Sequence, residues 1–204
     1  ASPQSRTLLP SSRPDERGLR APFFLMPKIQ NFKDHHQGET AAICGGGVSL
    51  PQDLRSIEPV DRLIGVNQHA LILPLDYLAF LDRHMWPLVK KYQDIMLVTK
   101  LSKFAYAGSH VIHADKAPPV RYSGMLAIWL ADYLGFDKVC VCGVDNYEDR
   151  KDDREYWWQG PQTNKVEKHK QTDQDLNLMK RFIDELRNPC RIFFASGRLK
   201  RMHQ

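Results

Sequence analysis

Glycines and a serine form the first group of residues in this sequence that could bind a ligand. The run Gly45-Gly46-Gly47-Val48-Ser49 directly follows a short apolar segment. Glycine lets a backbone approach a phosphate closely, and exposed N–H groups in such a turn bind anions. The spacing is neither G-x-G-x-x-G nor that of a P-loop, because no Lys-Ser or Lys-Thr pair follows. The run therefore indicates either an anion site of another kind or a tight connection without a ligand.

Amide and carboxyl groups follow three other apolar runs. Asn67, with Gln68 and His69 behind it, ends one of them. An amide there can bind the edge of a base or a sugar hydroxyl, because it both donates and accepts; a turn-forming Asn is the alternative. Asp82 and Asp145 end two further runs, and such carboxylates can hold a ribose, a metal ion or a structural loop.

A charged and aromatic stretch carries the groups best suited to proton transfer. Tyr147, Tyr156, Trp157 and Trp158 surround a run of mixed charges, and His169 lies shortly before an amphipathic segment. A His in that place can act as a general base near neutral pH, and Tyr hydroxyls can donate to a departing phosphate. Aromatic packing and an ordinary loop His are the alternatives.

Short apolar runs alternate with helical patterns along the chain. Helices are expected over residues 123–134, opened by Ser123-Gly124 and stopped by Gly135, and over about 172–187. Strands alternating with helices predict an α/β, Rossmann-like domain with a mostly parallel sheet covered by helices. Loops after parallel strands meet on one rim, where such proteins bind ligands. The expected strands are residues 40–44, 61–67, 76–82, 94–100, 109–114, 138–145 and 190–196.

Length and composition fit one medium-sized domain. The 204 residues are 42% hydrophobic and 26% charged, which is ordinary globular usage. Residues 1–38 carry five prolines and no sustained periodicity, and are expected to form an extended Pro-rich arm before a domain at 39–204. Such an arm could dock on the domain itself, or make a homo-oligomer or assembly contact. No apolar run is long enough for a transmembrane segment.

The cysteines indicate the cellular compartment, and the net charge indicates the kind of partner. The four cysteines lie in or beside predicted strands without zinc-site spacing, which favours reduced core thiols in a cytoplasmic protein. Net charge is +5, and the C-terminal residues 191–204 hold four basic residues and no acid. That tail could meet an anionic partner such as nucleic acid, a membrane surface or a substrate, or be a solvated end. The cysteines are Cys44, Cys140, Cys142 and Cys190.

Five motifs, in this order, resemble those of the bacterial lipooligosaccharide sialyltransferases that use a CMP-sugar donor. The wider superfamily that includes 6-hydroxymethylpterin pyrophosphokinase-like proteins is also similar. The resemblance covers roughly residues 40 to 197, and Asn146 stands where the family has an aromatic residue. The matching motifs are Gly45-Gly46-Gly47-Val48-Ser49-Leu50, Asn67-Gln68, Ser123-Gly124 with Leu134-Gly135, Gly143-Val144-Asp145-Asn146-Tyr147 with Tyr156, and His169 before Thr172-Asp173.

The resemblance implies a glycosyltransferase-like site that needs no metal. His169 would deprotonate the acceptor hydroxyl, and Tyr147 and Tyr156 would hydrogen-bond the leaving phosphate. The nucleotide would be held by Gly45, Gly46, Gly47, Ser49, Asn67, Ser123 and Gly124, with Asp145 as a further candidate.

Three functions follow from these observations. The leading one is a transferase that moves a sugar from a nucleotide-sugar donor, with a CMP-sugar favoured, to a hydroxyl acceptor. The second is Mg²⁺-dependent diphosphoryl transfer from ATP, with Asp82 or Asp145 as metal ligands. The third is a non-enzymatic assembly or virion-associated protein that keeps a transferase-like fold, because fold alone does not fix function.

Overall fold

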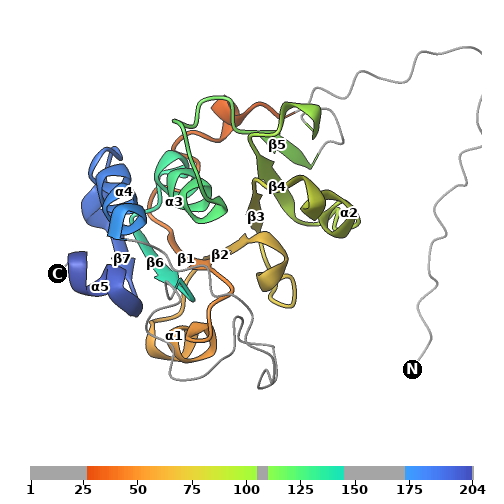
Figure 1. The fold of residues 1–204 in the computed structure, drawn as a ribbon. Helices are drawn as coiled ribbons and strands as arrows, with labels where there is room; N and C mark the ends of the chain where they lie inside the picture. Colours follow the sequence, from red (N-terminus) through yellow and green to blue (C-terminus); the bar gives the residue numbers. More distant parts are fainter. Residues whose placement is uncertain (1–26, 105–109, 145–172, 204) are drawn as a thin grey trace, which may run out of the picture.

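The computed structural model describes residues 27–104, 110–144 and 173–203. They form a seven-stranded sheet with the order β5-β4-β3-β2-β1-β6-β7, in which every pair of neighbours is parallel (Figure 1). Each predicted strand contains one observed strand, and the predicted α/β class is confirmed. The strands are β1 Thr40–Cys44, β2 Arg62–Val66, β3 Tyr77–Phe80, β4 Met96–Thr99, β5 Val111–His113, β6 Lys138–Cys142 and β7 Ile192–Phe194.

Strand β1 matches its predicted bounds, and the other observed strands are shorter than predicted by one to three residues at one or both ends. β2 stops at Val66 because Asn67 adopts a left-handed backbone with φ of 56°. β6 stops at Cys142, since Gly143 has φ of +66°, and the prediction of a strand up to residue 145 was wrong for Gly143 and Val144. These boundaries move the polar residues out of the sheet and into the loops at its rim.

Helix α3 (Ser123–Leu134) matches its predicted bounds and ends at Gly135, whose φ of 84° closes it in the left-handed conformation. Helix α4 (Asp173–Asp184) is the second predicted helix. Sequence reasoning missed α1 (Leu50–Ser56), α2 (Trp86–Val89) and α5 (Gly197–His203), because at seven residues or fewer they are too short for an apolar period to emerge. The 3₁₀ turns are η1 Ile29–Phe32, η2 Asn67–Ala70, η3 Arg83–Met85, η4 Ser102–Phe104 and η5 Pro189–Arg191.

The sheet is covered on both faces, as Figure 1 shows. Helices α3 and α4 pack on one face, and α1 and α2 contribute to a separate apolar cluster on the other. Coverage on both faces explains why the strands read as continuous apolar runs rather than alternating ones. The C-terminal basic tail also joins the fold, since Leu199 in α5 is fully buried.

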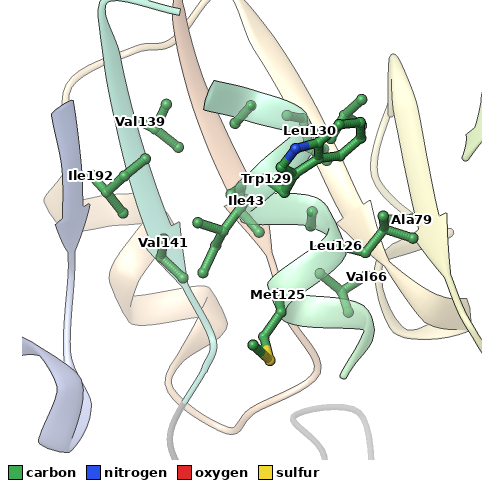
Figure 2. Packing of buried hydrophobic residues seen from close by; sticks show 14 of the residues in the cluster. Ile43, Val66, Ala79, Met125, Leu126, Trp129, Leu130, Val139, Val141 and Ile192 are labelled. Carbon is green, nitrogen blue, oxygen red and sulfur yellow. The ribbon is translucent and has the colours of Figure 1, made fainter. Parts of the chain in front are cut away.

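Helix α3 is the centre of the larger core. Its residues Met125, Leu126 and Trp129 belong to one buried cluster with residues of β1, β2, β3 and β6 (Figure 2). Burying one such side chain contributes about 1.5–3 kcal/mol, so the helix is held firmly against the strands. Because α3 begins at the carboxyl rim, this packing fixes the place of Ser123. The strand residues labelled around it are Ile43, Val66, Ala79, Val139, Val141 and Ile192.

Residues 27–38, the last part of the predicted arm, lie against the domain. Ile29 is fully buried in the same core as α3. The backbone N–H groups of Asp34 and His36 donate to Tyr133 O and Leu134 O at the end of α3, at 3.0 and 2.9 Å. This segment therefore packs against α3 as part of the domain.

The cysteines are free thiols in the structure. Cys44 and Cys142 are buried, and burial raises the pKa of the Cys44 thiol to about 12. Cys140 is half-buried, whereas Cys190 is exposed, so the expectation of a core position was wrong for Cys190. Within the described part of the chain, no helix is both long enough and apolar enough to cross a bilayer.

Candidate functional site

The strand order reverses direction between β1 and β6. The chain leaves β1 toward β2 on one side, while β6 and β7 lie on the other side of β1. In open α/β sheets, ligands bind at the carboxyl ends of the strands, at the point where the strand order reverses in this way. The glycine turn at residues 45–49 and the loop that begins at Gly143 both lie at this point.

The glycine turn is locked to the end of β6. The N–H groups of Gly45 and Gly47 donate to Cys142 O and Gly143 O, both at 2.8 Å. A Cβ at position 45 would lie 2.3 Å from Gly143 O, closer than real contacts allow. Gly45 is thus a site of close backbone approach, and these two N–H groups are already engaged within the protein.

Asp53 lies beneath this turn, in the first turn of α1, and is 3% exposed. Its Oδ2 accepts hydrogen bonds from Ser49 Oγ at 2.8 Å and from Gly143 N at 2.9 Å. A third bond comes from Ser196 Oγ at 2.9 Å, in the loop after β7. Sequence reasoning missed Asp53, although its spacing of four residues from the serine of the glycine turn was a readable signal.

Asn67 has two unusual properties at the end of β2. Its φ of 56° is uncommon for a residue other than glycine, although Asn tolerates it better than most. Its side-chain Oδ1 is buried and has no hydrogen-bond partner among the described residues. A buried acceptor without a partner costs free energy, and a ligand that donates a hydrogen bond would remove that cost.

Ser123 and Gly124 begin α3 on the same rim. Ser123 is 6% exposed, and its Oγ accepts a hydrogen bond from Leu81 N at 3.1 Å, just after β3. A hydroxyl that accepts in this way still has its own proton to donate. A Cβ added at Gly124 would meet nothing within 4 Å, so space is open beside this part of the backbone.

The remaining predicted residues fall into two groups. Asp82 is exposed and precedes η3, and Gln68 is also exposed, within η2. The others lie outside the described residues: Asp145, Tyr147, Tyr156, Trp157, Trp158 and His169.

The described groups form one polar edge across three neighbouring strands. The glycine turn follows β1, Asn67 follows β2, and Ser123 is bonded to the backbone after β3. The edge combines a buried acceptor, a hydroxyl donor and open space over glycine backbone. Within residues 27–104, 110–144 and 173–203, no group of three or more His, Cys, Asp or Glu side chains could hold a metal ion.

A surface pocket of about 160 Å³ lies elsewhere, at the last turns of α3 and α4. None of the predicted site residues lines this pocket. Its lining is Pro118, Trp129, Asp132, Tyr133, Phe182, Glu185, Leu186 and Arg187.

Comparison with known proteins finds similarity in structure but not in sequence. No protein-family model matches the chain, and no curated protein matches it. A similar solved structure is the sialyltransferase CstII from Campylobacter jejuni in complex with the substrate analogue cytidine-5'-monophosphate. It is 12% identical, with a TM-score of 0.54 over 78% of this chain and 81% of that chain. CstII with CMP-3FNeuAc gives 11% identity and a TM-score of 0.52, over 77% and 81% of the two chains. The chain therefore has a sialyltransferase-like fold.

Proposed function

We propose that this protein transfers a sugar from a nucleotide-sugar donor, with a CMP-sugar favoured, to a hydroxyl acceptor. The observation that carries the proposal is Asn67, whose buried Oδ1 lacks a partner among the described residues at the ligand-binding rim. An amide oxygen in that place accepts a hydrogen bond from a base amino group or a ribose hydroxyl. The fold is shared with a sialyltransferase that was solved with cytidine-5'-monophosphate.

The neighbouring groups suit the nucleoside part of such a donor. Ser123 has a proton to donate, and Gly124 leaves room for a ligand to approach the backbone. Gly46 and Ser49 complete the proposed wall over β1, and Asp145 is proposed to bind the ribose. The described members of this wall are neutral polar groups, which match hydroxyls and base edges better than they match several phosphates.

The hydrogen bonds of the glycine turn favour a ligand with one phosphate over a ligand with several. Phosphates bind to free backbone N–H groups, but those of Gly45 and Gly47 are engaged by carbonyl oxygens. The buried carboxylate of Asp53 beneath the turn would also repel added negative charge. This favours a nucleoside monophosphate leaving group over diphosphoryl transfer from ATP.

The proposed reaction is a direct displacement at the anomeric carbon of the sugar. The acceptor oxygen forms a bond to that carbon while the bond to the phosphate oxygen breaks, and the nucleotide leaves with the electron pair. His169 takes the acceptor proton as a general base. Tyr147 and Tyr156 donate hydrogen bonds to the leaving phosphate and stabilise its charge.

Ligand binding and turnover test this proposal. CMP is expected to raise the melting temperature of the full chain more than UMP, GMP or ATP does, because a ligand that binds the folded state stabilises it. A CMP-sugar is then incubated with hydroxyl acceptors and free CMP is measured. Asn67→Ala should abolish the CMP shift, whereas Gln93→Ala, an exposed amide before β4, should keep it. The proposal fails if no nucleotide or nucleotide sugar binds or turns over.

A further inference from the structure

Asp53 joins three loops through one oxygen atom. Its Oδ2 accepts from Ser49 Oγ at 2.8 Å, from Gly143 N at 2.9 Å and from Ser196 Oγ at 2.9 Å. The donors come from the loops after β1, β6 and β7, which are consecutive neighbours in the sheet. A single buried carboxylate therefore links the loops at the carboxyl ends of three strands.

The bonding pattern explains why a carboxylate can be buried here. An ionised carboxylate is costly to remove from water unless hydrogen bonds compensate it. The three donors are two hydroxyls and one backbone N–H, so hydrogen bonds from neutral groups compensate the burial of this carboxylate. Because it accepts and never donates when ionised, both serine hydroxyls and the backbone N–H can point at the same atom.

The same bonds orient Ser49. A serine hydroxyl has one proton, and Ser49 Oγ donates it to Asp53. Ser196 Oγ lies 2.9 Å from Asp53 Oδ2 and 3.0 Å from Ser49 Oγ, so its proton also points into this cluster. Asp53 thereby sets the rotamer of Ser49 and makes its oxygen an acceptor in any other hydrogen bond.

Asp53 also fixes where the chain leaves β6. Gly143 donates its N–H to Asp53 and accepts from Gly47 N through its carbonyl. A Cβ at Gly143 would lie 2.8 Å from Leu50 Cβ, in addition to the left-handed φ at that position. The backbone around Gly143 is thus held from two sides, two residues before Asp145 in the sequence.

We infer that Asp53 is a positioning residue of the proposed nucleotide site. It acts through Ser49 and Gly143, and it sets the separation of the loops that follow β1 and β6. The ligand part of this inference rests on the proposed function, whereas the positioning of the loops does not.

Two isosteric variants give a matched test in the full chain. Asp53→Asn exchanges a carboxylate oxygen for an N–H donor beneath the site. Asp132→Asn does the same to another buried carboxylate, which accepts from Arg187 N at 3.1 Å and Asn188 N at 3.0 Å. Asp132 lies nine residues beyond Ser123 in α3, about 14 Å along the helix axis from the carboxyl rim of the sheet.

Calorimetric titration of CMP gives the first readout. Asp53→Asn is expected to weaken CMP binding about tenfold, because a misplaced loop loses one good ligand contact. Asp132→Asn should lower the melting temperature but leave CMP affinity within about twofold. Ser196→Ala, which removes one of the three donors, should weaken binding by roughly threefold. Equal CMP affinity in the Asp53→Asn and Asp132→Asn proteins would overturn the inference.

Amide hydrogen exchange without ligand gives the second readout. Asp53→Asn should speed exchange in peptides that contain residues 45–49 and 143–144, relative to the rest of the chain, and Asp132→Asn should not. If the wild-type protein binds no nucleotide, the proposed function fails and this measurement alone decides the positioning role. Unchanged protection of these amides in Asp53→Asn would overturn the role as well.

Discussion

The backbone of Gly45 lies so close to Gly143 that a Cβ at position 45 would be 2.3 Å from the Gly143 carbonyl oxygen. The two residues directly follow the neighbouring strands β1 and β6, and Gly45 N also donates to Cys142 O at 2.8 Å. Close contact of the two loops therefore depends on the absence of a side chain at Gly45. This contact fixes the position of the glycine turn in the proposed site.

Substitution of Gly45 tests that contact. Gly45→Ala should destabilise the protein by roughly 2–3 kcal/mol, because the backbone oxygen it meets cannot move without separating β1 from β6. Gly124→Ala is the matched control for stability, since its Cβ would meet nothing within 4 Å. Urea unfolding of the two variants measures the difference, and equal stability would contradict the proposed close approach.

Asn67 should show opposite effects on stability and on binding. Asn67→Gly relieves the left-handed backbone and removes the buried acceptor, so the free energy of unfolding should rise by about 1 kcal/mol. CMP affinity should fall in the same variant under the proposed function. Urea unfolding and calorimetric titration measure the two quantities.

Asp34 provides the control for this pair of effects. It has the same φ of 56°, but its Oδ1 accepts a hydrogen bond from Arg187 Nη2 at 2.7 Å. That bond holds the pKa of the Asp34 carboxyl below its usual value. Asp34→Gly should therefore show no gain in stability and no change in CMP binding. A stable Asn67→Gly protein that binds CMP as the wild type does would remove Asn67 from the site.

His36 should make stability depend on pH. It is 6% exposed, stacks on Phe136 at 4.6 Å, and bonds Tyr77 Oη at 2.7 Å and Glu39 at 2.9 Å. Burial lowers its pKa, and the bond to Glu39 opposes this only in part. The neutral ring fits both bonds, with Nδ1–H donating to Glu39 and Nε2 accepting from the Tyr77 hydroxyl.

The sign of the effect follows from this lowered pKa. As pH falls below about 6.5, His36 in the unfolded chain takes up a proton that the folded protein does not bind. Stability should therefore decline as the pH falls below about 6.5, until the folded protein takes up the proton as well. Chemical unfolding across this range should give a flatter profile for His36→Gln than for the exposed control His84→Gln. Parallel profiles would contradict the assignment.

Truncation should separate the two parts of the N-terminal region. Deleting residues 1–26 leaves Ile29 and His36 in place and provides the reference chain for a longer deletion. Deleting residues 1–38 exposes the end of α3 and removes Ile29, a loss of about 1.5–3 kcal/mol for that side chain alone. Thermal unfolding measures both, and equal stability of the two truncated chains would show that residues 27–38 are dispensable.

Metal removal should separate the two enzymatic hypotheses. Release of CMP from a CMP-sugar should persist in excess chelator, because the proposed roles are filled by His169, Tyr147 and Tyr156. Diphosphoryl transfer from ATP would instead stop, since Mg²⁺ neutralises the transferred phosphates. Activity lost on chelation and restored by Mg²⁺ would favour the diphosphotransferase.

The amino-acid pattern was sufficient to locate the strands and the two longest helices of the described residues. Helix α3 was predicted at its observed bounds, because Ser123-Gly124 and Gly135 mark its ends around a helical apolar period. The strands were found as apolar runs, but β2 and β6 were predicted to extend too far, because local patterns do not reveal where a backbone turns left-handed. Helices α1 and α5 were missed, since their burial depends on neighbours distant in the sequence.

The candidate site was likewise predicted only in part from the sequence. By itself the sequence determined a glycine turn, an Asn and a Ser-Gly pair at strand or helix ends, because residue type and local spacing carry that signal. Only the tertiary structure decided that the N–H groups of Gly45 and Gly47 donate to the end of β6. It also decided that Asp53 accepts three hydrogen bonds from separate loops. Two of its three donors lie 90 and 143 residues away in the sequence. Such contacts are set by the order of the strands, which no local pattern encodes.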